Sequence, residues 1–231
     1  MSLEMSLAID LRRLRFRYGG GPWVLDIPEL TLERGMRAFL FGPSGSGKTT
    51  LLGVVAGVLE AEEGEVRVLG EDLASLSGAQ RDAFRAEHIG YVFQMFNLIP
   101  YLSVLDNIAL PARMTAGRRA RLDGAGVRET AAQLADHLHI GDLLKKPVTE
   151  LSVGQQQRVA ACRALIGSPE LIVADEPTSS LDFDRREAFL ELLFQECERA
   201  GATLVFVSHD RTLEGMFSRT ISLPDVNKAV L

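Results

Sequence analysis

The sequence lacks an apolar run of about 20 residues, the length that a membrane-spanning helix needs. Its start, MSLEMSLAID, lacks the basic stretch and the long apolar segment of a secretory signal. A basic excess is also absent, because 25 Lys and Arg stand against 31 Asp and Glu. Proteins that bind nucleic acids usually carry such an excess. We therefore expect a cytoplasmic protein that does not bind nucleic acid.

Cysteine is scarce. Cys162 and Cys197 form no CxxC or CxxH pattern, which argues against a zinc module and indicates ordinary thiols in a reducing compartment. Internal repeats, low-complexity tracts and heptads are missing as well. Apolar residues, in contrast, make up 46% of the 231 residues, which is enough for a packed core in one domain with a subdomain.

Apolar strands alternate with helices along most of the chain. Strands are expected at residues 12–18, 23–33, 37–42, 65–70, 89–94, 170–176, 203–209 and 220–224. Helices are expected at residues 49–59, 103–114, 126–138, 151–165 and 184–200. Ser152 is the expected N-cap of the helix at residues 151–165. This order predicts an α/β fold with a mostly parallel sheet that is covered on both faces. From about residue 103 to 165 the pattern becomes helical, which indicates a subdomain.

A glycine-rich loop lies between an expected strand and an expected helix. GPSGSGKT, residues 42–49, fits G-x-x-x-x-G-K-[ST] without a mismatch. Glycines let backbone N–H groups face a phosphate, and the following helix N-terminus adds positive potential. Lys48 would reach the β- and γ-phosphates, and the Thr49 hydroxyl would bind Mg²⁺. A simple turn before a helix is the competing interpretation. The expected ATP-binding residues of this loop are Gly42, Ser44, Gly45, Ser46, Gly47, Lys48, Thr49 and Thr50.

Two carboxylates follow the apolar run of LIVADE. Asp175 and Glu176 stand at the end of a strand, where a charge is costly unless it has a function. We expect Asp175 to hold Mg²⁺ through water and Glu176 to polarise the attacking water. A strand that merely ends at the surface is the alternative, and the glycine-rich loop argues against it.

The base of the nucleotide leaves a weaker signal. GTPases commonly read guanine with N-K-x-D, but Asn227 and Lys228 are followed by Ala229 and Val230. Tyr18, at the end of a basic strand, could instead stack on adenine. A tyrosine with only a surface or core role is the alternative.

Four further motifs occur in order. They are Gln94 in YVFQ, LSVGQ at residues 151–155, Asp182 in SSLD and His209 in VSHD. With them, the chain resembles the ATP-binding subunit of an ABC transporter from near residue 8 to about residue 224. The resemblance implies one nucleotide-binding domain with a P-loop NTPase core at about residues 8–94 and 166–224. It also implies an antiparallel N-terminal β region and a helical subdomain at about residues 95–165.

The resemblance assigns roles to these motifs. Two copies would pack head to tail, so that the signature loop of one meets the ATP of the other, with contacts from Ser152, Gly154, Gln155 and Asp182. Gln94 would contact Mg²⁺ and the attacking water, and His209 would contact the γ-phosphate. Val153 stands where the family usually has glycine; it leaves Ser152 and Gly154 intact, so we expect function to survive.

The resemblance also implies a membrane permease on a separate chain, which would hold this one at the inner face of the membrane. The apolar stretch at residues 90–111 would be its docking groove, or else ordinary helix packing. The sequence most resembles those of the ATPases of lipoprotein-release, macrolide-export and cell-division transporters. We expect the arginines of residues 117–128 to form a solvated face, with lipid contact as the alternative. His88, His137 and His139 are expected to be structural.

Two rival functions remain. A soluble ABC ATPase that acts on DNA or ribosomes would usually carry a coiled coil, a zinc module or a second copy of the domain, and this chain shows none in its sequence. A small-molecule kinase would explain the glycine-rich loop but not the signature, Asp182 or His209. The sequence does not indicate which substrate is transported, because the membrane and external subunits would select it.

Overall fold

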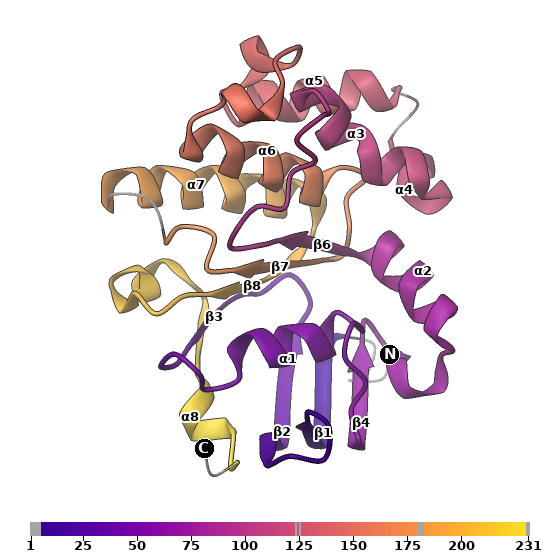
Figure 1. Ribbon diagram of the computed structural model, residues 1–231, viewed down its shortest axis with the longest axis vertical. Coiled ribbons are helices and arrows are strands. Elements are labelled where there is room, and N and C mark those ends of the chain that lie inside the picture. The colour runs from indigo at the N-terminus through magenta and orange to yellow at the C-terminus, as the bar shows by residue number, and fades with distance from the viewer. Residues whose placement is uncertain (1–5, 123, 125, 180–182, 230–231) are drawn as a thin grey trace. The chain divides into compact units, whose positions relative to one another are not determined.

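The computed structural model describes residues 6–122, 124, 126–179 and 183–229. The chain divides into two units, of which the first is Met1–Arg85 with Thr203–Leu231 and the second is Ala86–Ala202 (Figure 1). No helix in the described part of the chain is long and apolar enough to cross a membrane. The expected subdivision into residues 8–94 with 166–224 and residues 95–165 stays a prediction.

An antiparallel sheet begins the first unit, as predicted. Its strands, in the order β2-β1-β4-β5, are β1 Leu7–Arg17, β2 Trp23–Glu33, β4 Glu63–Val68 and β5 Glu71–Asp72. Leu11 and Leu14 are buried, and the basic residues between them are exposed. The register of β1 against β4 shifts near Arg13, whose φ is 52°. Only glycine fits opposite at position 64, since a Cβ there would lie 2.2 Å from the Arg13 oxygen.

Parallel strands form the other sheet layer of this unit. They are β3 Arg37–Phe41, β8 Thr203–Val207 and β9 Arg219–Ser222, with β3 in the middle. Helix α1, Lys48–Val55, is the next helix after β3. Its Leu51, Leu52 and Val55 enclose a small apolar space together with residues of both sheets, namely Ile9, Leu30, Leu32, Leu40, Val205 and Ile221. This layer forms the core of the first unit and fixes the start of α1.

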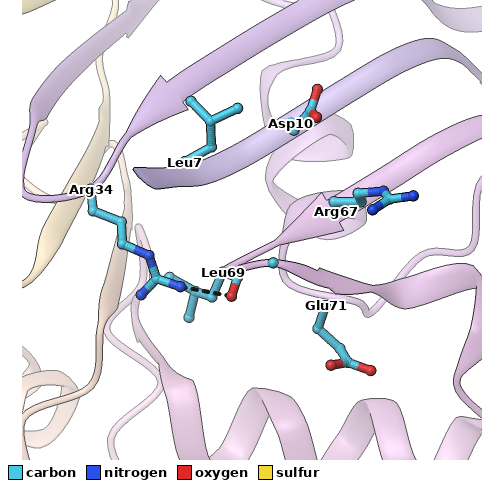
Figure 2. A pocket seen from close by; sticks show the side chains of 7 residues that line it. Leu7, Asp10, Arg34, Arg67, Leu69 and Glu71 are labelled. Carbon is cyan, nitrogen blue, oxygen red and sulfur yellow. Dashed lines mark hydrogen bonds between the residues drawn. The ribbon is translucent and has the colours of Figure 1, made fainter. Parts of the chain in front are cut away.

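A cavity of about 360 Å³ lies at one end of the strands of the antiparallel sheet, where β1 begins and β2 and β4 end (Figure 2). Across it, an Arg34 N–H donates to the Leu69 oxygen at 2.7 Å. The buried Asp10 carboxylate pairs with Arg12, whose Nη2 lies 3.0 Å from Oδ2. The cavity contains none of the residues that the sequence predicts for nucleotide binding; its lining is Leu7, Asp10, Arg34, Arg67, Leu69, Gly70 and Glu71.

The second unit pairs two parallel strands with helices. The strands are β6 Ile89–Val92 and β7 Leu171–Asp175, with Val92 opposite Ala174. The helices are α3 Val104–Met114, α4 Ala116–Ala120, α5 Val127–His137, α6 Val153–Leu165 and α7 Phe183–Ala200. Helix α3 packs against α5 and α6. The predicted mixed α/β fold is confirmed, although helix α2, Gly78–His88, was not expected.

Short segments complete the two units. They are η2 Leu73–Ser75, η3 Gly141–Leu143, η4 Val148–Glu150, η5 Arg211–Met216 and α8 Leu223–Val226. Cys162 and Cys197 are buried and form no disulfide. Burial is the main cause that raises the pKa of Cys162, so its thiol stays protonated.

The expected solvated arginine face holds for Arg119 and Arg128, which are exposed, and is wrong for Arg118. It is 2% exposed, and its guanidinium donates to the oxygens of Ala86, Ile89, Ala164 and Ile166 at 2.7, 2.6, 3.2 and 3.0 Å. Burial lowers its pKa to about 10, which leaves it charged at neutral pH. The short helix α4 thus places a cation over the C-terminal end of α6 and the start of β6.

Replacing Arg118 with methionine should destabilise the fold by more than about 3 kcal/mol. Each carbonyl loses a bond from a charged donor, a contribution of about 1.5–3 kcal/mol. Arg119→Met is the matched control, because Arg119 is exposed and makes one bond to the Arg113 oxygen at 3.1 Å. Its effect should stay within about 0.5 kcal/mol. Urea unfolding followed by circular dichroism measures both, and equal losses would contradict this role of Arg118.

Candidate functional site: a phosphate loop and a carboxylate-bearing strand end

The glycine-rich loop joins the end of β3 to the start of α1. Gly47 caps α1 with φ 95° and no side-chain cap, and the first turn holds no acidic residue. The positive end of this helix is therefore not neutralised by a side chain of its own first turn, and such an end favours phosphate. A Cβ on Gly47 would come within 3.0 Å of Leu25 and 3.2 Å of the Val24 oxygen, so the loop needs glycine there.

Lys48 and Ser46 are polar residues of the loop that are buried. Lys48 is 7% exposed, and its Nζ donates to the oxygens of Gly42 and Pro43 at 2.8 and 3.0 Å. Its ammonium is thereby folded over the loop that it follows. The Ser46 hydroxyl is buried without a hydrogen-bond partner in the described residues. A hydroxyl of this kind needs an acceptor, and a phosphate oxygen supplies one. The loop therefore fits a phosphate group.

Tyr18 lies beside this loop. Its hydroxyl is 3.3 Å from the Thr50 hydroxyl, and its ring meets Phe16 edge-on at 4.8 Å between centroids. The residue is 55% exposed, so its ring has surface left for a planar base. The structure thus brings together two residues, Tyr18 and Thr50, that the sequence assigned to ATP binding.

His209 lies at the same carboxyl end of the parallel strands as the loop. Strands β3 and β8 run parallel with Leu40 opposite Val207, so the residues after both strands emerge at one edge. The Ser208 N–H donates to the Leu40 oxygen at 3.2 Å, and the Ser208 hydroxyl accepts from the Asp210 N–H at 3.0 Å. His209 itself is exposed. Ligands of α/β sheets commonly bind at such carboxyl ends.

A second strand edge carries Gln94, Asp175 and Glu176. Because β6 and β7 are parallel with Val92 opposite Ala174, all three residues lie at the carboxyl ends of neighbouring strands: Asp175 ends β7, Glu176 follows it, and Gln94 follows β6. Asp175 is 8% exposed. Glu176 has φ 45°, a strained conformation for a non-glycine residue and one that is frequent at functional sites. Burial first, and the Asp175 charge second, raise the pKa of the Tyr91 phenol above its usual range.

The signature loop begins helix α6. Ser152 is the N-cap as predicted; its hydroxyl accepts from the Gln155 N–H at 3.4 Å. The Gln155 side chain accepts from the Ser152 N–H at 2.9 Å, which completes a capping box. Val153, at the first helical position, is 47% exposed. Asp182 lies outside the described residues.

The predicted residues thus form a set within each unit. The first unit brings together Tyr18, the loop of residues 42–50 and His209, and the second holds Gln94, Asp175, Glu176 and the Ser152 cap. Asn227 is a supporting residue of the loop that the sequence did not reveal. The Asn227 side chain donates to the oxygens of Val24 and Ser46 at 2.9 and 3.4 Å. No local pattern indicates this contact, because its partners lie about 180 or more residues away.

Comparisons with known proteins place this geometry in a family. The family model described as "ABC transporter" matches residues 25–179. YbbA of Escherichia coli K12, an uncharacterised ABC transporter ATP-binding protein, is 38% identical over 93% of each chain. The lipoprotein-releasing system ATP-binding protein LolD 2 of Rhodospirillum rubrum is 36% identical over 94% of each chain. The macrolide export protein MacB of Rhodopirellula baltica is 37% identical over 94% of this chain and 32% of its own.

A solved structure agrees with these relatives. The dimeric ATP-binding cassette MJ0796, in a post-hydrolysis state bound to ADP and Pi, superposes with a TM-score of 0.81. It is 32% identical over 93% of each chain. Family, relatives and fold agree with the strand–loop–helix geometry around Lys48. The chain therefore belongs to the ABC transporter family, as an ATP-binding and ATP-hydrolysing subunit.

Proposed function

We propose that this ATPase works as a head-to-tail homodimer around two Mg-bound ATP molecules and drives a separate membrane permease. The observation that carries the proposal is the phosphate loop, with Lys48 folded over it and the buried Ser46 hydroxyl lacking a partner in the described residues. The dimeric state of MJ0796 supports the pairing of two copies.

Binding is assigned to the loop and its neighbours. The Lys48 ammonium would face the β- and γ-phosphates, and the N–H groups of residues 44–50 would surround them. Thr49, Gln94 and, through water, Asp175 would hold Mg²⁺. Their hydroxyl, amide and carboxylate oxygens are the donors that this ion prefers. Bound there, Mg²⁺ would neutralise developing phosphate charge.

Hydrolysis is assigned to Glu176. Its carboxylate would accept a proton from the attacking water as the water oxygen bonds to the γ-phosphorus and the bond to ADP breaks. Gln94 would orient that water, and His209 would contact the γ-phosphate. The shared strand edge of Gln94 and Glu176 supports a joint action on one water.

Ser152, Gly154, Gln155 and Asp182 are assigned to the ATP held by the other copy. The Ser152 cap supports this role, because a hydroxyl at a helix N-terminus suits an anion. Within one chain the capping box already fixes Gln155 to Ser152, so Gln155 would act chiefly by holding Ser152. Val153, exposed beside it, would contact the partner copy.

Tyr18→Ala should weaken ATP binding by about 5- to 150-fold, because stacking of a base on an aromatic ring contributes about 1–3 kcal/mol. Tyr18→Phe is the control that keeps the ring and removes the contact to Thr50; it should bind within about twofold of wild type. Titration of a fluorescent ATP analogue measures both. Equal losses in the two variants would show that the hydroxyl, and not the ring, is needed.

The permease would dock on exposed apolar side chains of the second unit. Phe93, Met95, Tyr101 and Met114 are 38%, 81%, 84% and 77% exposed, and a bound permease would cover these apolar side chains. Through this contact the ATPase would lie at the inner face of the membrane. Copurification in detergent with the membrane protein encoded next to it tests the proposal, and Met95→Asp with Tyr101→Asp should abolish that copurification. Which substrate is transported would be decided by the membrane subunits.

A further inference from the structure

The segment that carries Gln94 has an unusual backbone. After β6 ends at Val92, two successive non-glycine residues, Phe96 and Asn97, have φ of 58° and 48°. Left-handed conformations are uncommon for such residues, and for phenylalanine in particular. They persist only where surrounding contacts determine them. Some group must therefore hold this turn.

Arg163 of helix α6 holds it. Its Nη2 donates to the Phe96 oxygen and its Nη1 to the Asn97 oxygen, both at 2.6 Å. The planar guanidinium suits two carbonyls that converge in this way. Burial lowers the pKa of Arg163, although an arginine stays charged at neutral pH. The contact is thus two short, charge-assisted hydrogen bonds to the strained residues.

A second anchor holds the chain just beyond the turn. The Asn107 side chain, fully buried on α3, accepts from the Ile99 N–H at 2.8 Å and donates to the Ile99 oxygen at 3.1 Å. The Phe96 ring is itself buried at 7% exposure. Phe93, Gln94 and Met95 are exposed. The exposed residues are therefore held between the end of β6 and the Arg163 contact.

Helix α6 connects this contact to the signature loop. Ser152, its N-cap, precedes Arg163 by 11 residues, which is about 16 Å along a helix. The helix contains no proline, and no glycine after Gly154, so nothing in it provides a hinge. Movement of the Ser152 end would be carried to Arg163 by one rigid element.

We infer that Arg163 is a positioning residue that ties the placement of Gln94 to helix α6 through the backbone of Phe96 and Asn97. Engagement of Ser152 by the other copy's ATP would then set Gln94 for its own ATP. This inference rests on the roles proposed above for Gln94 and Ser152. Arg163 touches neither nucleotide nor water in this scheme and acts only through the turn.

Arg163→Lys in the full chain tests it. Lysine keeps the charge but cannot hold two carbonyls with a fork. We expect kcat to fall by about tenfold, as small misplacements of a catalytic group do, with the KM for ATP within about twofold. Half-saturation by Mg²⁺ should rise about threefold, since Gln94 is a proposed ligand. Arg158→Lys is the matched control on the same helix, because Arg158 donates to the Leu138 oxygen at 3.1 Å. Its kcat should stay within about twofold of wild type.

A double-mutant cycle with Gln94→Ala separates positioning from packing. If Arg163 acts through Gln94, R163K should lower kcat by less than about twofold in the Q94A background. Asn97→Pro breaks the turn from the loop side, since proline fixes φ near −65°, and should reproduce the R163K loss even if R163K folds poorly. An unchanged rate in N97P, an additive cycle, or an equal loss in R158K would overturn the inference. An unchanged rate in Q94A would overturn the proposed role of Gln94 and this inference with it.

Discussion

Alanine in place of Lys48 should weaken ATP binding by about 30- to 1,000-fold. Loss of a buried charged partner of the phosphates costs about 2–4 kcal/mol, and 1.4 kcal/mol is a tenfold change in affinity. The loop should also loosen, because the Lys48 ammonium holds the oxygens of Gly42 and Pro43. Isothermal titration calorimetry measures the dissociation constant directly.

Lys145→Ala serves as the control for this experiment. Lys145 is exposed and lies outside the phosphate loop, so its loss changes the net charge equally without touching the proposed contact. Its affinity should match wild type. If Lys48→Ala binds ATP within about threefold of wild type, Lys48 does not face the phosphates.

Glutamine in place of Glu176 should slow ATP hydrolysis by at least about a hundredfold, the range that a positioned base contributes. ATP binding should persist or tighten, because one negative charge leaves a site crowded by phosphates. Glutamine keeps the size of the side chain, so the strained backbone at position 176, with φ 45°, is disturbed little. Phosphate release under ATP saturation measures the rate.

Glu29→Gln is the matched control, because Glu29 is an exposed carboxylate on β2. It should hydrolyse ATP at the wild-type rate. A Glu176→Gln variant that keeps more than about a tenth of the wild-type rate would exclude Glu176 as the general base.

Local sequence patterns predicted those features of the structure that depend on residues close together in the chain. The phosphate loop follows a buried strand and begins a helix, and each of these features can be predicted from about a dozen consecutive residues. The positions of Asp175 and Glu176 were predicted in the same way, because two charged residues follow an apolar run. Ser152 as the helix N-cap was predicted from its residue type and the apolar pattern that follows it, and the structure confirms it.

Contacts between residues far apart in the sequence could not be predicted from local patterns. Arg118 was expected in water because its own stretch is polar, yet its four carbonyl partners lie at residues 86, 89, 164 and 166. Arg163 and Asn227 were missed for the same reason. Helix α2 was missed because it buries no residue fully and holds only one large apolar residue, Phe84, so the apolar pattern that marks the other helices is weak there. The proposed role of Ser152 goes further still, since its ligand would belong to another copy.

One measurement tests the shared site most directly: the mass of Glu176→Gln in ATP and in ADP, by size-exclusion chromatography with light scattering. The monomer has a mass of 25.3 kDa. We expect twice that mass in ATP, because stalled nucleotide joins the Lys48 loop of one copy to the Ser152 loop of the other, and the monomer mass in ADP. Adding Ser152→Arg should restore the monomer in ATP, since a bulky cation would replace the capping hydroxyl. A monomer of Glu176→Gln at saturating ATP, or a dimer that survives Ser152→Arg, would contradict it.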